Sequence, residues 1–188
     1  RTPKDTVSGL EKLIADVPNG EQFFTTRNGK ALERISAAEA ARWVVHTQAY
    51  DPSGIRSGAV GDPEVKGGKG YPIGPAWCGH LGLVWLKGKN FNETLLLNLV
   101  PADAGDLKGV PVTTEWDWCT WEASTPETSA RGNYSRLDPK GTPRDLSIPK
   151  LLTWHSRRIK LIGDSSGVTS VVLAQGDNLA PQQMQRYE

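Results

Sequence analysis

The sequence predicts an α+β fold in one domain of 188 residues. Helical and strand patterns are mixed along the chain without the regular strand–helix–strand alternation that builds a parallel sheet. Two segments carry helical patterns with capping residues, and two β-rich runs separated by a turn stand near the C-terminal end. Segments rich in glycine and proline separate these elements, so we expect short antiparallel strands joined by long irregular loops.

The N-terminal segment predicts a helix, a hairpin and a second helix. Apolar residues recur at helical spacing over 7–17, and a Pro-Asn-Gly tripeptide at 18–20 ends the pattern. The next run, QFFTTRNGKALERI, contains an Asn-Gly dipeptide at 28–29, which is the preferred two-residue hairpin turn. Ser36 and Glu39 then form a capping box ahead of AAEAARWVVHTQAY, which predicts a helix.

A glycine-rich segment follows that helix, and the remaining elements come after it. Residues 50–74 read YDPSGIRSGAVGDPEVKGGKGYPIG, and glycine at this density permits positive φ values or close backbone approach. Next, HLGLVWLKG predicts a strand, and NETLLLNLV predicts a helix that is capped by Asn92 and stopped by Pro101. At the C-terminal end, SRRIKLIGD and VTSVVLAQGD flank a DSSG turn and predict a β-hairpin.

The glycine-rich segment does not match either of the common phosphate-binding motifs. A P-loop would need Ser or Thr after Gly68-Lys69, where Gly70 stands, and a glycine at the position of Pro63. The dinucleotide fingerprint would need a glycine at the position of Ile73, and Pro72 blocks the helix that should follow. The sequence therefore excludes both motifs in this segment.

Hydrolase and metal motifs are also missing from the sequence. There is no GxSxG elbow, and His46, His80 and His155 are scattered without HExxH or Cys–His ligand spacing. A His/Asp/Ser cluster could still assemble in space, so a small hydrolase or transferase with a glycine-rich substrate loop stays open as the alternative function. A pocket with a perturbed histidine or carboxylate beside residues 54–70 would favour that alternative.

Charge and aromatic residues are unevenly distributed. The formal net charge is only +1, which argues against a nucleic-acid-binding surface over the whole molecule. Residues 131–160 nevertheless carry eight Lys or Arg against two Asp, a surplus that suits a solvated face, or a face turned to phosphates or to another subunit. The patch EWDWCTWE suits packing under a loop, stacking on bases, or anchoring of a partner protein through its tryptophans, Trp116, Trp118 and Trp121.

Cysteine usage and hydropathy indicate a cytoplasmic protein. Cys78 and Cys119 belong to no CxxC motif, which fits a reducing compartment, although one disulfide is possible. No apolar run approaches the ~20 residues of a membrane span, and no signal peptide opens the chain. The chain starts at Arg1 without a methionine, so we expect a piece of a longer protein.

Three long blocks resemble the CasA family, the large subunit of the type I-E CRISPR surveillance complex Cascade. The blocks are HTQAYDPSGIRSGAVGDPEVKGGKGYPIG, NETLLLNLVP and LLTWHSRRIKL, and they are similar to the actinobacterial branch. The resemblance runs across nearly the whole chain in order. It implies that residues 1–188 are a single domain, most of an N-terminal domain whose C-terminal helical bundle is absent.

The resemblance also implies a function. It implies a non-catalytic subunit that helps to recognise the protospacer-adjacent motif in double-stranded DNA, begins strand separation and recruits the helicase-nuclease. Base pairing then reads the long sequence while protein reads the short motif. The implied partners are other Cascade subunits, the CRISPR guide RNA, the double-stranded DNA target and the helicase-nuclease, with no membrane and no cofactor.

Two loops match elements of the family. In the family, one loop enters the minor groove of the DNA, which is only about 6 Å wide. Residues 51–58 match this loop and are here named the motif loop. The resemblance implies that its DNA-binding residues are Pro52, Ser53, Gly54 and Arg56. A second family loop contacts the guide RNA or neighbouring subunits. Residues 24–35 match it and are here named the contact loop. The resemblance implies that its contact residues are Phe24, Arg27, Lys30 and Arg34.

Three further expectations concern other parts of the chain. Residues Arg157, Arg158 and Lys160 are expected to form a basic track. Some family members carry a zinc-binding cysteine cluster after the WHSRRIKL block, but IGDSSGVTS stands there, so no metal is expected. A third hypothesis is a protein-interaction scaffold anchored by the tryptophan patch.

Overall fold

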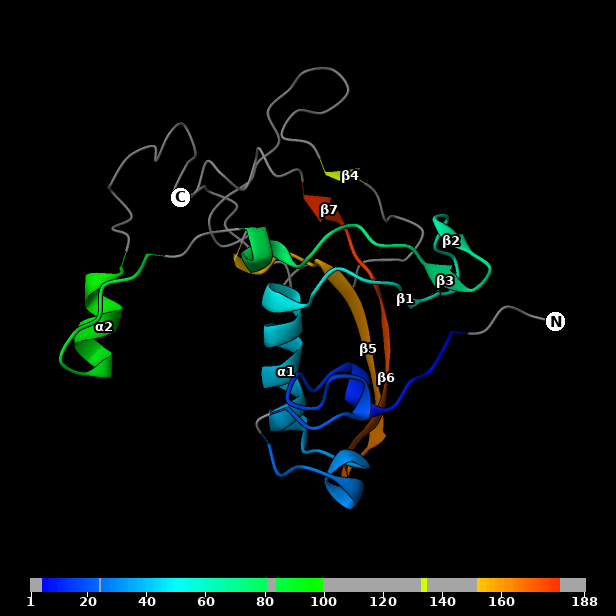
Figure 1. Ribbon diagram of the computed structural model, residues 1–188, viewed down its shortest axis with the longest axis horizontal. Helices are drawn as coiled ribbons and strands as arrows, with labels where there is room; N and C mark the ends of the chain where they lie inside the picture. The colour runs from blue at the N-terminus through cyan, green and yellow to red at the C-terminus, as the bar shows by residue number, and fades with distance from the viewer. Residues whose placement is uncertain (1–4, 24, 81–83, 100–132, 135–151, 180–188) are drawn as a thin grey trace, which may run out of the picture.

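The computed structural model describes residues 5–23, 25–80, 84–99, 133–134 and 152–179. The described residues combine helices with short strands and irregular loops, which confirms the predicted α+β class. The main body consists of the helix α1 (Ala37–Tyr50) alongside a long hairpin of β5 (Arg157–Asp164) and β6 (Gly167–Gln175), as Figure 1 shows. None of the described helices is long and apolar enough to cross a membrane.

The predicted capping box and C-terminal hairpin are both confirmed. The Ser36 hydroxyl accepts a hydrogen bond from the Glu39 backbone N–H at 3.1 Å, so α1 starts directly after it. The strands β5 and β6 pair antiparallel from Arg157↔Gln175 to Asp164↔Gly167, with a bulge at Ile162/Gly163. The DSSG turn therefore closes the hairpin where the sequence places it.

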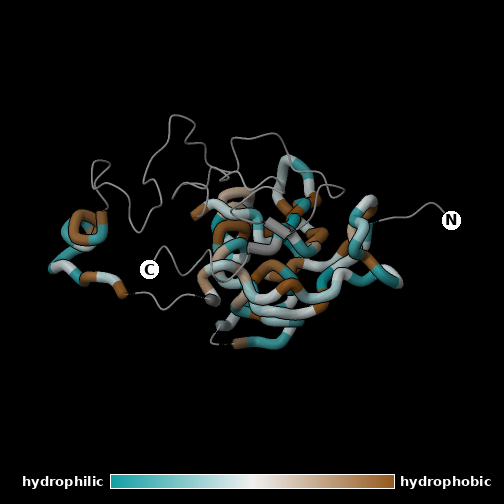
Figure 2. The backbone as a smooth tube through the Cα atoms, turned by 90° about the horizontal axis from the view of Figure 1, so that it is seen from above, coloured by the Kyte–Doolittle hydropathy of each residue, from teal (hydrophilic) through white to brown (hydrophobic). Residues whose placement is uncertain are grey.

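The hydrophobic core lies between the N-terminal segment, α1 and β6. Its buried members are Leu10, Leu13, Ile14, Val17, Ile35, Ala40, Val168, Val171 and Leu173. Trp43 and Val44 of α1 and Ile159 of β5 pack against this cluster. Figure 2 shows hydrophobic stretches inside the body and also on the helix at the left, α2 (Phe91–Leu97), where Phe91, Leu95 and Leu96 are exposed.

The predicted helix over residues 7–17 is wrong. Four of its apolar residues, Leu10, Leu13, Ile14 and Val17, are buried as the spacing requires, whereas Val7 is exposed. The buried residues lie on the short 3₁₀ helix η1 (Leu10–Lys12) and on turns before η2 (Pro18–Gly20). The backbone of Ser8 forms a bridge with Val171 of β6 and exchanges two 2.9 Å hydrogen bonds with it. This pairing holds the start of the segment extended and prevents a continuous helix.

The predicted hairpin at residues 28–29 is also wrong. Asn28 is extended and Gly29 opens the 3₁₀ helix η3 (Gly29–Leu32). A backbone bridge between Ile35 and Val168 holds the end of this segment against β6. The contact loop thus pairs with a distant strand instead of folding back on itself.

The glycine-rich segment contains a small antiparallel sheet that the sequence did not predict. Its strands are β1 (Arg56–Ser57), β2 (Val65–Lys66) and β3 (Lys69–Gly70), in the order β1-β3-β2. The 3₁₀ helix η4 (Trp77–His80) follows. The sheet directly continues the motif loop.

The remaining predictions had mixed outcomes. Within the predicted strand HLGLVWLKG, residues 84–88 form no strand. The helix α2 is confirmed, but Asn90 caps it in place of Asn92, through a 2.9 Å bond from the Glu93 N–H. The strand β4 (Asn133–Tyr134) pairs in parallel with β7 (Asn178–Leu179). The tryptophan patch, Cys119 and Pro101 lie outside the described residues.

Candidate functional site

Two buried side chains hold the motif loop from inside the protein. The carbonyl of Pro52 accepts a hydrogen bond from Arg157 Nη2 at 3.3 Å. The carbonyl of Gly54 accepts one from Gln175 Nε2 at 2.8 Å. Arg157 and Gln175 are each 1% exposed, and they are opposite partners at the paired end of β5 and β6. The rigid hairpin therefore fixes the backbone of the loop.

Arg157 has all of its guanidinium nitrogens bonded to protein oxygens. Nε donates to Asp51 Oδ2 at 2.5 Å, Nη1 to the Ser156 carbonyl at 2.8 Å, and Nη2 to the Gly74 carbonyl at 2.9 Å as well as to Pro52. Burial lowers the pKa of Arg157, whereas the bond to Asp51 raises it. An arginine keeps its charge in proteins, so a buried cation lies directly beneath the loop.

The Asp51 carboxylate is shared between two arginines. Besides Arg157, Arg56 donates from Nε to Asp51 Oδ2 at 2.8 Å, and its Nη2 reaches the Pro52 carbonyl at 2.6 Å. Two positive charges therefore face one negative charge at the base of the loop. The Arg56 side chain is 17% exposed, so the surplus positive charge lies close to the surface.

The loop turns its carbonyls inward and leaves backbone donors unused. Within the described part of the chain, no hydrogen bond uses the N–H groups of Ser53, Gly54 or Ile55. Pro52, Ser53 and Ile55 are exposed, and Gly54 is half-buried. The arrangement can therefore present N–H donors above a positively charged base.

A cavity of about 130 Å³ lies beside the motif loop, next to the N-terminal segment and the end of α1. Its polar lining includes His46, Thr47, Asp51 and Arg56. The Asp51 carboxylate is occupied by two guanidinium groups, and the His46 ring contacts the rings of Trp43 and Tyr50, which flank it on α1.

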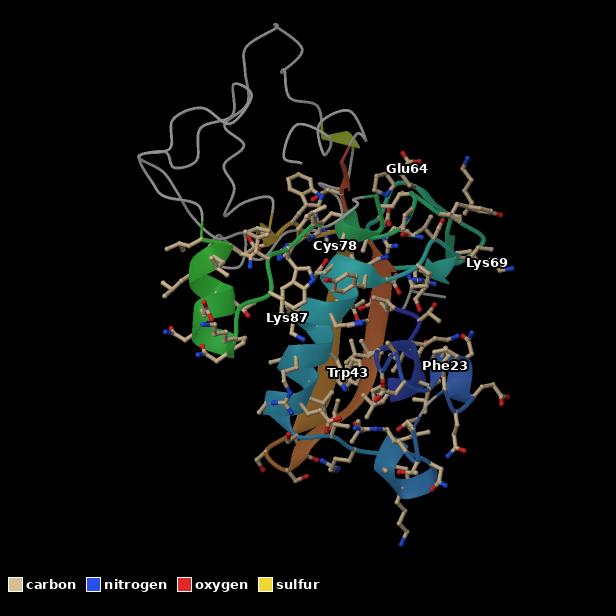
Figure 3. All side chains as sticks on the ribbon, turned by 60° about the vertical axis from the view of Figure 1, so that its left-hand side comes forward. Phe23, Trp43, Glu64, Lys69, Cys78 and Lys87 are labelled. Atoms are coloured by element: carbon tan, nitrogen blue, oxygen red, sulfur yellow. The ribbon has the colours of Figure 1, made fainter. Side chains whose placement is uncertain are left out.

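Cys78 and Tyr50 interact near the C-terminal end of α1, outside the lining of this cavity. The thiol of Cys78 is buried, and burial raises its pKa, which disfavours the nucleophilic thiolate. The pKa of Tyr50 is also raised, chiefly by the charge of Cys78. Among the residues that the structure describes, no group of three His, Cys, Asp or Glu side chains could hold a metal ion. Figure 3 shows Cys78 beside the C-terminal end of α1.

The contact loop lies at the opposite end of α1 from the motif loop (Figure 1). A helix of 14 residues is roughly 20 Å long, so the two loops do not form one site. Arg27 pairs with Glu39, and it also donates to the Ala31 carbonyl at 3.3 Å. Lys30 is exposed, and Phe24 lies outside the described residues.

Arg34, the last cation of the contact loop, binds the turn of the C-terminal hairpin. Its Nη1 donates to Asp164 Oδ1 at 2.7 Å, to the Ser166 hydroxyl, and to the Gly167 carbonyl at 3.3 Å. Hydrogen bonds from Ser166, followed by the ion pair with Arg34, hold the pKa of Asp164 well below its usual range. Both partners of this ion pair are exposed, at 40% and 60%.

The three residues of the expected basic track do not share one surface. Arg157 is buried beneath the motif loop, as described above. Arg158 is largely buried and donates from Nη2 to Asp177 at 2.9 Å. Lys160 is 69% exposed and lies 3.5 Å from Asp5. Of these three side chains, Lys160 alone is largely exposed to solvent.

Sequence reasoning missed the residues that position the motif loop. Gln175 ends the buried run VVLAQ, and a polar residue at the end of an apolar strand is a weak signal of a buried hydrogen bond. Gln48 of α1 bonds both the N–H and the carbonyl of Arg157, at 2.9 and 2.8 Å. No local pattern indicates this pairing, because its two partners are 109 residues apart.

Comparisons with known proteins identify relatives of the chain. The model of the family described as CRISPR-associated protein Cse1 matches residues 1–187. The solved structure of Thermobifida fusca Cse1 is 46% identical with a TM-score of 0.71, over 93% of this chain and 30% of that one. Cse1 from Acidimicrobium ferrooxidans is 30% identical with a TM-score of 0.67, over 98% and 31% of the two chains.

A more distant solved structure, Thermus thermophilus CasA (Cse1), shares the fold. It is 20% identical with a TM-score of 0.51, over 95% of this chain and 31% of that one. The chain thus spans about 30% of the length of the solved relatives. A search among curated proteins gave no match.

Proposed function

The chain belongs to the CRISPR-associated protein Cse1 family, and on this premise we propose that it is a non-catalytic part of the RNA-guided Cascade complex. Its motif loop contributes to recognition of the protospacer-adjacent motif in double-stranded DNA. The resemblance to CasA stated from the sequence agrees with this family, because one solved relative carries both names.

One observation supports this function most strongly, namely that the N–H groups of Ser53, Gly54 and Ile55 donate no hydrogen bond within the described part of the chain. In the minor groove, A·T and T·A pairs both present only acceptors, and a G·C pair adds the donor N2–H₂. A loop that offers backbone donors complements the acceptors. Since that pattern is degenerate, such a loop would tolerate several related motifs.

The support beneath the loop fits the same role. Buried hydrogen bonds from Arg157 and Gln175 fix the loop carbonyls before any ligand binds, which reduces the entropy lost on binding. The surplus positive charge of Arg56 and Arg157 over Asp51 attracts the phosphates that border the groove. Arg56 would then act on DNA through the electrostatic field and the loop shape, because its donors are bonded within the protein.

The other expected partners extend this proposal. The contact loop offers the exposed Lys30, and its arginines are held by ion pairs that a guide-RNA phosphate or an acidic neighbour could replace. Lys160 remains available from the proposed basic track. Assembly with other Cascade subunits in the cytoplasm, target-strand separation and recruitment of the helicase-nuclease are proposed from the family.

The enzyme alternative, a small hydrolase or transferase, has less support. A small cavity does lie beside the motif loop, but its Asp51 carboxylate is bound by two arginines. Such a carboxylate is a poor general base, because its charge is already neutralised. The scaffold hypothesis depends on the tryptophan patch, which is outside the described residues.

The proposal is tested in the reconstituted complex with the variant Ser53→Phe. Ser53 is exposed, so the bulky ring would obstruct entry into the groove without disturbing the core. A side chain at Gly54 would be a poorer probe, because its Cβ would lie 3.0 Å from the Arg56 guanidinium. We expect Ser53→Phe to weaken binding of motif-containing duplex at least tenfold and to reduce the preference over motif-free duplex.

The matched control is Ser165→Phe, which places the same ring on an exposed serine in the turn after β5. It should leave both affinities unchanged. If Ser53→Phe preserves the affinity and the motif preference, then the motif loop does not read the motif and the assignment is wrong.

A further inference from the structure

The hairpin of β2 and β3 places two lysines directly opposite each other. Gly67 and Gly68 join the strands with φ values of 58° and 75°, the geometry of a type I′ two-residue turn. Lys66 and Lys69 are the Cα partners that flank this turn. Opposite partners in an antiparallel strand pair place their side chains on the same face of the sheet. Both lysine side chains therefore leave the hairpin on one face, next to its turn.

This arrangement is unfavourable without an anion. Like charges directly opposite each other destabilise a strand pair. Both lysines are exposed, and in the described part of the chain neither side chain has a hydrogen bond or an ion pair. The nearby Asp62 is buried, and its carboxylate accepts from the Glu64 N–H at 2.9 Å. Figure 3 shows Lys69 pointing outward from the hairpin, at a distance from Glu64.

The hairpin is rigidly connected to the motif loop. β3 pairs with β1, which begins within the motif loop. The Gly58 N–H donates to the Gly68 carbonyl at 2.9 Å, and a Cβ on Gly58 would lie only 2.5 Å from that oxygen. Gln175 Nε2 bonds both the Gly54 carbonyl, at 2.8 Å, and the Gly70 carbonyl, at 3.3 Å. One buried amide therefore fixes the loop and the hairpin relative to each other.

We propose that Lys66 and Lys69 together bind a backbone phosphate of the duplex whose minor groove the motif loop enters. This inference rests on the proposed function, because a loop inside the narrow minor groove is bordered on both sides by phosphates. The lysines hold the duplex in position and do not read its sequence, since phosphate contacts carry no base information. The unfavourable lysine pair of the free protein becomes a favourable two-pronged contact in the bound state.

The experiment compares the reconstituted complex containing Lys66→Gln and Lys69→Gln with the unsubstituted complex. Dissociation constants are measured for motif-containing and motif-free duplexes over a series of salt concentrations. Each lost phosphate contact reduces the slope of log K against log salt by about 0.9, so loss of this single contact should decrease the slope by about 1. Both duplexes should lose the same fraction of affinity, and the motif preference should stay unchanged.

The matched control is the double variant Lys87→Gln and Lys89→Gln, which removes the same charge from exposed positions before α2. For this control, the slope of log K against log salt should equal that of the unsubstituted complex. An unchanged slope in the hairpin variant, or a decrease equal to the control's, overturns the inference. Reduced assembly of the chain into the complex would also overturn it, since the hairpin would then contact RNA or another subunit.

The Ser53→Phe variant separates the two proposals. If it abolishes the motif preference while the hairpin variant leaves the salt slope unchanged, the phosphate contact is wrong and the motif loop stands. If it preserves the preference, the proposed function itself fails, and the hairpin cannot be acting beside a motif-reading loop.

Discussion

The motif loop and the contact loop adjoin opposite ends of the same helix and are held in different ways. The motif loop is fixed by donors from Arg157 and Gln175, which solvent hardly reaches. The contact loop is held by the backbone bridge between Ile35 and Val168 and by the ion pairs of Arg27 and Arg34, whose side chains are partly or largely exposed. Buried hydrogen bonds in a low dielectric are strong and insensitive to salt, whereas exposed ion pairs are weak and screened.

This difference fits what each loop is proposed to do. A backbone that must fit a groove about 6 Å wide benefits from one fixed shape before it binds. A loop that must bind phosphates or acidic side chains can exchange an internal carboxylate for an external anion at little cost. The following substitutions test whether the two loops really differ in this way, beginning with the largest expected effect.

Arg157→Met should destabilise the chain most. The change removes the donor to the Gly74 carbonyl and one of the two donors to each of the Pro52 and Ser156 carbonyls. It also removes one of the two cations that pair with Asp51. Breaking a buried ion pair by removing one partner costs about 3–5 kcal/mol. The unfolding free energy is measured by urea denaturation of the purified chain.

Lys160→Met on the same strand provides the control for Arg157→Met, because Lys160 is exposed. Surface substitutions of this kind change the unfolding free energy by less than about 0.5 kcal/mol. Equal effects of the two variants would mean that the Arg157 network does not hold the motif loop.

Gln175→Leu should have a smaller effect on stability and a specific effect on recognition. It removes the hydrogen bonds to the Gly54 and Gly70 carbonyls, at roughly 1 kcal/mol each. The freed loop should discriminate less between motif-containing and motif-free duplexes, while its affinity for motif-free DNA stays unchanged. The ratio of the two dissociation constants in the reconstituted complex measures this effect.

Thr169→Val on the same strand controls for a lost hydrogen bond at a site away from the motif loop. Its hydroxyl donates to the Ile162 carbonyl at 3.3 Å, and its loss should not alter the motif preference. If Gln175→Leu also preserves the preference, Gln175 contributes to stability alone.

Gly167→Ala tests a backbone anchor of the contact loop, the bridge between Ile35 and Val168. Gly167 has a φ of +140°, and an added Cβ would lie 2.4 Å from the Ile35 carbonyl, which accepts from the Val168 N–H at 2.8 Å. We expect a loss of about 1–3 kcal/mol from strain and from opening of this bridge. Thermal unfolding of the chain gives the measurement.

Gly20→Ala is the matched control, because Gly20 has a positive φ of 88° and no atom of the described residues lies within 4 Å of an added Cβ. It carries the strain of the backbone conformation without the clash. A Gly167→Ala variant no less stable than Gly20→Ala would show that the bridge to Ile35 adds nothing to the anchoring of the contact loop.

The sequence could predict the features that depend on neighbouring residues, but not those that depend on contacts between distant parts of the chain. The capping box of Ser36 and Glu39 and the hairpin around the DSSG turn depend on neighbouring residues, and both were predicted. The Asn-Gly dipeptide at 28–29 is also a local signal, but the bridge between Ile35 and Val168 overrides it. The motif-loop residues are predicted from the resemblance alone. The support of this loop by Arg157 depends on a contact with Asp51 across 106 residues, which no local pattern encodes.

The smallest effect is expected for Asp164→Asn, which weakens the exposed ion pair with Arg34. The pKa of Asp164 in the folded chain lies below its unfolded value of about 3.9, so its contribution to stability is complete above that pH and is lost as the pH falls below it. The wild-type and Asp164→Asn chains should therefore differ slightly at pH 7, and the difference should be smaller at pH 3, where part of this contribution is lost. Urea denaturation at pH 7 and pH 3, each with and without 0.5 M salt, measures the difference.

Added salt should reduce that difference, while the cost of Arg157→Met should stay nearly constant, because a buried pair is screened much less than an exposed one. If the Asp164→Asn effect proved independent of salt and persisted in acid, the contact loop would be held as firmly as the motif loop. The ion pairs at the contact loop could then not be exchanged for an RNA phosphate at little cost, and its proposed role in binding the guide RNA would lose its physical basis.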